Sequence, residues 1–222
     1  MKKQRPVVVV LAAGRGLRFR GQGHKLEQAL GAETVLGCTL KNAMATRLPV
    51  VVVSSERLAP SVRRLVASRD VVELSEFDAK GRPLPVGMGY SIAAGVGATG
   101  DADGWLILPG DMPMLRPESL LAVAAVLEQH PVAYAQYRGQ RGHPVGFGAE
   151  LFSELVALQG DEGARRILAR YPSYGVELDD EGVLLDVDSQ ADLEGLRGRL
   201  VKPGAESPAV RSAVPHPARP GS

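Results

Sequence analysis

The chain has 222 residues, of which 45% are hydrophobic and 23% charged, and its formal net charge at pH 7 is +1. This composition is typical of a globular protein that can bury a substantial core. It lacks the basic surplus that nucleic acid or an anionic membrane surface attracts, so neither is expected as a partner. The one cysteine, Cys38, excludes an intrachain disulfide and lies in an apolar helical pattern typical of a core thiol.

The N-terminal segment carries Lys2, Lys3 and Arg5, and the apolar run that follows covers only residues 7–13. That run is too short for the core of a signal peptide and far too short to span a bilayer. We therefore expect a cytoplasmic protein.

Short β-branched runs that end at glycine, serine or proline predict the strands. In chain order they cover residues 7–11, 49–53, 71–74, 105–108, 132–137 and 144–147, with a last extended piece at 183–187. Helical patterns predict helices at 34–46, 57–68, 88–98, 117–129, 149–158, 162–170 and 191–200. This alternation predicts a three-layer α/β/α fold with a mostly parallel, Rossmann-like sheet, in which ligands bind at the carboxyl ends of the strands.

The composition changes near the C-terminus to proline, alanine, glycine, serine and arginine, starting at Lys202. Such a segment buries too little apolar surface to offset the entropy of ordering it. We expect residues 1–200 to form one domain and residues 201–222 to be a disordered tail.

A glycine-rich segment follows the first strand and reads Leu11-Ala12-Ala13-Gly14-Arg15-Gly16-Leu17-Arg18-Phe19. Its small residues allow backbone N–H groups to approach a phosphate, and Arg15, Arg18 and Lys25 supply positive charge. A dinucleotide loop would need a third glycine where Phe19 stands, and a Walker loop would need Gly-Lys-Ser/Thr. A plain strand-to-loop connection gives no reason for three cations. The pattern favours a phosphate-binding loop.

Asp111 follows the strand at 105–108, where an α/β fold places its ligands, although an aspartate there also suits a turn. Mg²⁺ is usually held by one or two carboxylates together with phosphate oxygens. Asp186 and Asp188 are the candidates for a second carboxylate, and Asp188 is alternatively a cap of the last helix. The residues alone leave these readings open.

Several segments, in order, resemble the MobA-like nucleotidyltransferases, and more narrowly their molybdenum cofactor cytidylyltransferase (MocA-like) branch. The glycine-rich segment followed by a lysine is similar to the opening motif of that family. The later segments are Gly87-Met88-Gly89-Tyr90-Ser91-Ile92, Leu108-Pro109-Gly110-Asp111-Met112-Pro113, Arg141-Gly142-His143-Pro144-Val145, Gly160-Asp161-Glu162-Gly163-Ala164-Arg165 and Asp186-Val187-Asp188-Ser189. The resemblance extends over residues 7–200 and implies the nucleotidyltransferase variant of the fold.

This resemblance implies transfer of CMP from CTP to the phosphate of a molybdopterin cofactor, with release of pyrophosphate. It implies a catalytic set of Lys25, Arg18 and Asp111, and Mg²⁺ on Asp111 and Asp188. A molybdenum hydroxylase is the implied client. The residues implied for binding nucleotide and acceptor are Leu11, Ala12, Ala13, Gly14, Arg15, Gly16, Ser54, Gly87, Ser91, His143 and Arg165. Among them Ala13 favours CTP, because the guanylyl branch has glycine there, while His143 and Arg165 are expected on the acceptor side.

The sequence departs from the family motif at Arg20, where a glycine is usual. Lys25 also lies about two residues further along the chain than the lysine of the motif. Three alternatives stay open: a nucleotidyltransferase with another acceptor such as a sugar phosphate, an NAD(P)H-dependent reductase of the same family, and a nucleotide-binding module without turnover. Lys25, Asp111 and Asp188 favour a metal-bound triphosphate over the last two.

Overall fold

A seven-stranded mixed sheet forms the centre of the computed structural model, which describes residues 5–14, 16, 19, 21–77, 80–82, 84 and 87–201. The strands are β1 (Val7–Ala12), β4 (Val50–Ser55), β5 (Val71–Leu74), β6 (Gly104–Pro109), β7 (Val132–Tyr137), β8 (Gln140–Gly148) and β9 (Ser173–Glu177). Their order across the sheet is β5-β4-β1-β6-β8-β7-β9. β8 runs antiparallel to its neighbours β6 and β7, and the other pairs are parallel. The predicted α/β fold with a mostly parallel sheet is confirmed.

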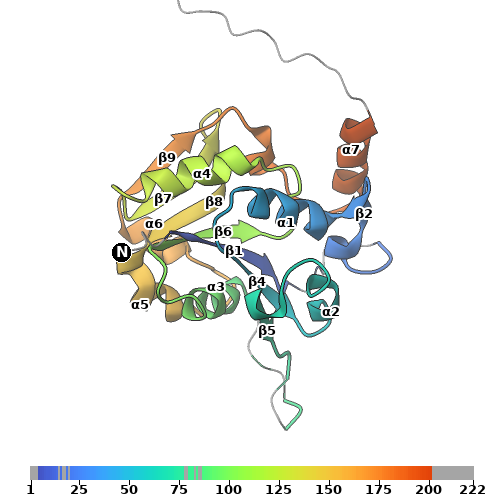
Figure 1. Cartoon of the computed structure of the whole chain (residues 1–222), viewed down its shortest axis with the longest axis horizontal. Coiled ribbons are helices and arrows are strands. Elements are labelled where there is room, and N and C mark those ends of the chain that lie inside the picture. Colours follow the sequence, from blue (N-terminus) through green and yellow to red (C-terminus); the bar gives the residue numbers. More distant parts are fainter. Residues whose placement is uncertain are drawn as a thin grey trace, which may run out of the picture.

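Helices cover both faces of this sheet (Figure 1). The helices are α1 (Val35–Ala45), α2 (Ala59–Val62), α3 (Met88–Gly97), α4 (Pro117–Val126), α5 (Phe152–Val156), α6 (Arg165–Arg170) and α7 (Gln190–Val201). Short 3₁₀ turns are η1 (Lys25–Glu27), η2 (Ser68–Asp70), η3 (Ala149–Leu151) and η4 (Glu181–Leu184), and β2 (Ala29–Leu30) pairs with β3 (Glu33–Thr34). In the described part of the chain, none of these helices has the length and apolarity to cross a membrane.

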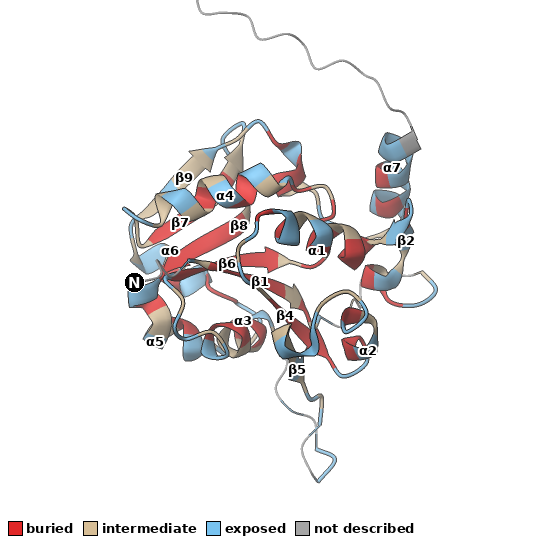
Figure 2. Cartoon of the chain, viewed as in Figure 1, coloured by how far each residue is buried: buried red, intermediate tan, exposed pale blue. Residues whose placement is uncertain are grey.

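Two apolar cores lie on opposite faces of the sheet, and both appear as buried residues in Figure 2. Val8 and Val10 of β1 pack with α1 and α4, whereas Val7 and Val9 pack with α3, α5 and α6. The valine run is buried on both sides because successive side chains of a strand alternate between the faces, and helices cover each face.

The strand order reverses beside β1, because β4 lies on one side of it and β6 on the other. The carboxyl ends of β1 and β6 therefore meet at the topological switch point, beside which this class of fold has its ligand-binding crevice. The glycine-rich loop follows β1 and Asp111 follows β6, so both reach this crevice.

The sequence predicts a last extended piece at 183–187, and this prediction is wrong for residues 183 and 184. Residues 181–184 form η4 instead, because the Asp180 side chain accepts a hydrogen bond from Gly182 N at 2.9 Å and caps the turn. The helix expected at 57–68 is also shorter. After Val62 the chain continues through Arg64 N→Ser61 O and Leu65 N→Val62 O bonds, which are 3₁₀-type contacts.

Candidate active site

The turn that carries Asp111 is fixed from two sides. Gly110 N donates to Leu11 O of β1 at 2.9 Å, and the Thr39 hydroxyl of α1 donates to Gly110 O at 3.0 Å. A side chain at Gly110 would place its Cβ only 2.9 Å from Leu11 O, so the close approach to β1 requires glycine. Asp111 O in turn accepts from Val187 N at 3.0 Å, which brings the segment carrying Asp186 and Asp188 against this turn.

Three carboxylates and one ammonium group meet there. Oxygens of Asp111, Asp186 and Asp188 lie within 4.8 Å of one another. Lys25 Nζ donates to Asp111 Oδ2 at 2.5 Å and to Asp188 Oδ1 at 2.9 Å. The structure therefore joins Lys25, Asp111 and Asp188, which the sequence singled out, and adds Asp186 to the group.

The protonation of this cluster follows from its burial and its charges. Burial lowers the pKa of Lys25, but the Asp111 and Asp188 carboxylates outweigh it, so that the net pKa is raised and the amine stays charged. The pKa of Asp186 is also raised, first by burial and then by the neighbouring Asp111 and Asp188 carboxylates. Because three carboxylates face one lysine, the charges are not balanced, and an additional cation would be stabilised there.

A divalent cation fits these residues. Asp111 Oδ1 is buried and accepts no hydrogen bond from the described part of the chain, so one strong acceptor is left for a ligand. Carboxylate oxygens are the ligands that Mg²⁺ and Mn²⁺ prefer. The donor set is therefore suited to a hard divalent ion, with Asp111 at its centre.

His143 on β8 lies near this cluster. Its Nδ1 is buried and has no hydrogen-bond partner among the described residues. Burial lowers the pKa of His143, against the opposing effects of the Asp111 carboxylate and a backbone hydrogen bond with Ile107. The imidazole is therefore neutral at pH 7, with one nitrogen that makes no hydrogen bond to the described residues.

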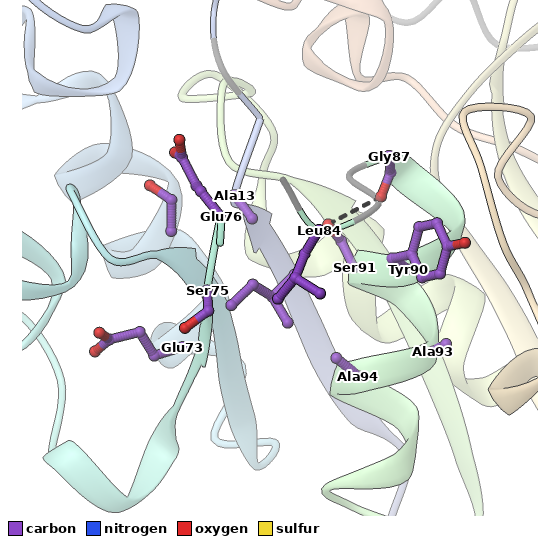
Figure 3. A pocket seen from close by; sticks show the side chains of 12 residues that line it. Ala13, Glu73, Ser75, Glu76, Leu84, Gly87, Tyr90, Ser91, Ala93 and Ala94 are labelled. Carbon is purple, nitrogen blue, oxygen red and sulfur yellow. Dashed lines mark hydrogen bonds between the residues drawn. The ribbon is translucent and has the colours of Figure 1, made fainter. Parts of the chain in front are cut away.

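A cavity of about 570 Å³ opens beside the glycine-rich loop, between the ends of β4 and β5 and the start of α3. Figure 3 shows Ala13, Gly87, Tyr90 and Ser91 around it, and these include three residues predicted for nucleotide binding. Ser54, also predicted there, is fully buried and its hydroxyl donates to Ser55 O. Ser55 lines the cavity in its place, because adjacent strand residues face opposite sides.

The remaining predicted residues of the loop differ in exposure. Ala12 is buried at the end of β1, Leu11 is half-buried, and Gly14 and Gly16 continue the chain beyond the strand. Arg15 and Arg18 lie outside the described residues, as does the tail from Lys202. The backbone of α7 extends to Val201, one residue past the expected domain boundary.

Two of the sequence motifs pack against each other. A Cβ at Gly87 would lie 2.4 Å from Gly160 O, and Gly89 N donates to the same oxygen at 2.8 Å. The glycines at the start of α3 therefore permit the close approach of the loop at 159–163. Arg165 follows that loop as the first residue of α6 and is exposed, and the structure describes no contact between it and the carboxylates.

The sequence matches the MobA-like NTP transferase domain over residues 8–175. The chain belongs to this family. It is 31% identical over 201 residues to the purine catabolism protein PucB of Bacillus subtilis, a match that covers 85% of this chain and 94% of that protein. The family expectation from the sequence is thereby confirmed, and the chain is a nucleotidyltransferase of the MobA-like type.

Solved structures agree with this family. Rv0371c of Mycobacterium tuberculosis in complex with manganese superposes with a TM-score of 0.71 at 27% identity, covering 88% of this chain and 98% of that one. A nucleotidyl transferase from Methanothermobacter gives a TM-score of 0.71 at 25% identity, covering 89% and 98%.

Sequence reasoning missed two residues of this MobA-like site. Asp186 is a candidate in the sequence, but the resemblance to the family favours Asp188 for the metal, so Asp186 is left out of the predicted site. His24 was not singled out, although it directly precedes Lys25 in a loop with few apolar residues. It is 5% exposed, and a buried histidine in such a polar loop is the signal that could have found it.

Proposed function

We propose that this chain is a Mg²⁺-dependent nucleotidyltransferase that moves CMP from CTP to the phosphate of a molybdopterin cofactor and releases pyrophosphate. The observation that carries the proposal is the cluster of Lys25, Asp111 and Asp188 at the switch point of the sheet, with one Asp111 oxygen that has no hydrogen-bond partner among the described residues. Family membership supports the nucleotidyl transfer itself.

The nucleotide is assigned to the crevice between β1 and α3. The base and ribose would occupy the cavity lined by Ala13, Gly87 and Ser91, which has the size of a small-molecule site. Lys25, with Arg15 and Arg18 from the glycine-rich loop, would neutralise the triphosphate. Ala13 supports CTP because its methyl group narrows the cavity where the guanylyl branch has glycine.

In the proposed reaction an oxygen of the acceptor phosphate attacks the α-phosphorus of CTP. A new P–O bond forms, the bond between the α-phosphorus and the β-bridging oxygen breaks, and pyrophosphate leaves with that electron pair. An ionised phosphate carries no proton to remove, so no general base is needed, and catalysis consists of positioning and charge neutralisation.

The residues divide this work. Asp111 and Asp188 would hold the metal, and a bound divalent ion supplies charge neutralisation at the reacting phosphates. Lys25 would exchange its carboxylate partners for phosphate oxygens when CTP enters. The neutral His143 would contact the acceptor substrate through Nδ1. Arg165 would donate two hydrogen bonds to the phosphate of that substrate.

A molybdenum hydroxylase is the proposed client for the product. The relative PucB is named for purine catabolism. That name is in keeping with a client enzyme that acts on a nitrogen heterocycle such as a purine.

The test is pyrophosphate release by the purified protein with Mg²⁺, each of the four NTPs, and molybdopterin with or without molybdenum. We expect release with CTP that depends on the pterin. Asp111→Asn should lower kcat by about 10²–10³-fold, because it removes the charge that binds the metal. Circular dichroism should show an intact fold. Asp101→Asn, an exposed aspartate away from the crevice, is the matched control.

Each other outcome contradicts a defined part of the proposal. Near-normal turnover by Asp111→Asn contradicts the metal site. Turnover of CTP with a sugar phosphate instead of the pterin contradicts the acceptor. Tight NAD(P)H binding without CTP binding contradicts the transferase and favours a reductase.

A further inference from the structure

His24 connects the glycine-rich loop to the turn that carries Lys25. Its side chain is 5% exposed. The imidazole Nε2 lies 2.9 Å from Gly14 O, and Leu26 N donates to Nδ1 at 3.2 Å. One ring nitrogen therefore contacts the backbone of the glycine-rich loop, and the other caps η1, which begins at Lys25.

Both contacts suit the neutral tautomer with hydrogen on Nε2, since Nε2 then donates and Nδ1 accepts. Burial lowers the pKa of His24, and the nearby Arg57 and Lys25 cations act in the same direction, against Glu27 and the bond to Gly14. Because both nitrogens are engaged by the backbone, the ring has no free position for proton transfer to a substrate. The imidazole therefore acts as a clamp, by which we mean that its two nitrogens hold Gly14 O and Leu26 N.

The glycine-rich loop also packs directly on this clamp. A Cβ at Gly16 would lie 3.4 Å from His24 Nε2 and 3.6 Å from Lys25 Cγ. Gly16 has φ +61°, and its carbonyl accepts from Phe19 N at 3.0 Å. The Gly16 backbone therefore lies close to both the imidazole and the stem of Lys25.

We propose that His24 is a positioning residue that fixes the distance between the backbone of Gly14 and Gly16 and the Lys25 ammonium, so that both groups meet the same nucleoside triphosphate. This inference rests on the proposed function. Compared with the family motif, this chain has about two more residues before Lys25, so the connection from the glycine-rich loop to Lys25 is longer. The contact between His24 and Gly14 O fixes the two ends of this connection relative to each other.

Two substitutions separate the contact with Gly14 from the cap of η1. Asn in place of His24 retains an oxygen near the position of Nδ1, which can accept from Leu26 N, but has no atom at the position of Nε2. Gln is long enough to donate to Gly14 O. His130→Asn, on a histidine stacked against Tyr174 far from the crevice, is the matched control.

The experiment measures CTP affinity by equilibrium dialysis with Mg²⁺, together with KM and kcat for pyrophosphate release. We expect His24→Asn to raise Kd and KM for CTP by about tenfold, which corresponds to one lost buried hydrogen bond of ~1.4 kcal/mol. His24→Gln should recover most of the affinity, and His130→Asn should match the wild type. Comparable melting temperatures for the two His24 variants would exclude a general loss of structure as the cause.

A spectroscopic measurement tests the clamp without any nucleotide. The ¹⁵N shifts of His24 should report the neutral tautomer with hydrogen on Nε2 at pH 7, and the opposite tautomer or an imidazolium overturns the inference. Equal CTP affinity of His24→Asn and wild type also overturns it, while the proposed function stands. If the wild type binds none of the four NTPs, the proposed function fails, and the positioning role fails with it.

Discussion

Lys25 occupies the position between two carboxylates that a divalent cation would also occupy. It contacts Asp111 and Asp188 at hydrogen-bond distance, and their charges hold it protonated. A lysine and a metal ion on the same oxygens compete, because each reduces the negative charge that attracts the other. In the proposed reaction, a triphosphate that draws Lys25 away would leave the carboxylates available to the metal.

This competition predicts that Lys25→Met binds Mn²⁺ more tightly than the wild type when no nucleotide is present. Three carboxylates then face the ion without an ammonium group, and a gain of tenfold or more is expected, equivalent to ~1.4 kcal/mol. Electron paramagnetic resonance of free Mn²⁺ gives the affinity. Turnover with CTP should fall in the same variant.

The control is Lys41→Met, since Lys41 is an exposed residue of α1. An unchanged or weaker Mn²⁺ affinity in Lys25→Met would show that Lys25 and the metal do not share these carboxylates.

At the scale of elements, Asp180 joins the start of α4 to η4. Its carboxylate accepts from Arg116 N at 2.9 Å, Ser119 Oγ at 2.6 Å and Gly182 N at 2.9 Å. The side chain is 5% exposed and ion-pairs with the Arg116 guanidinium. One residue thereby caps a helix and a turn that are distant in sequence, and η4 leads directly into the segment with Asp186 and Asp188.

Asp180→Ala should lower the free energy of unfolding by about 2–4 kcal/mol, because it leaves several buried donors without an acceptor. Urea denaturation measures this. Asp179→Ala is the matched control, since Asp179 is exposed and uses its backbone oxygen, not its carboxylate, to contact Arg116. Equal destabilisation by the two variants would contradict the capping role.

The elements also show where sequence patterns succeed. The valines of β1 and the run at 105–108 predicted their strands because a strand covered on both faces needs continuous apolar residues. The extended piece predicted at 183–187 is wrong at Val183 and Leu184, which belong to η4, because these two apolar residues look extended in isolation. The conformation of η4 depends on the cap from Asp180, and on the contact of Gly182 with Met114 O, where a Cβ would lie at 2.3 Å.

For the molecule as a whole, burial of histidines makes stability depend on pH. The pKa of His24 is lowered in the folded state, so between that value and the ordinary value of 6.5 the unfolded chain binds more protons than the folded one. Stability therefore rises with pH in this window and is lost as the pH falls below 6.5. His143 contributes with the same sign, because burial also lowers its pKa.

We expect the free energy of unfolding of the wild type to drop between pH 7 and pH 5 by more than that of His24→Gln, which cannot titrate there. Urea denaturation at the two pH values compares them. Arg57, Lys25 and Glu27 face His24 and are present in both proteins, so the comparison isolates the imidazole. Identical pH dependences would show that His24 keeps its ordinary pKa.

The amino-acid sequence by itself determined the layers, the family and the parallel strands other than β9, because these depend on local apolar periodicity and on short motifs that each lie within a few residues. It also indicated Lys25, Asp111 and Asp188 one by one. Only the tertiary structure decided that Lys25 bridges the two carboxylates, that Asp186 joins them and that His24 ties the glycine-rich loop to Lys25. These relations depend on distances between segments up to 163 residues apart, which strand order and hydrogen-bonded turns fix and local sequence does not.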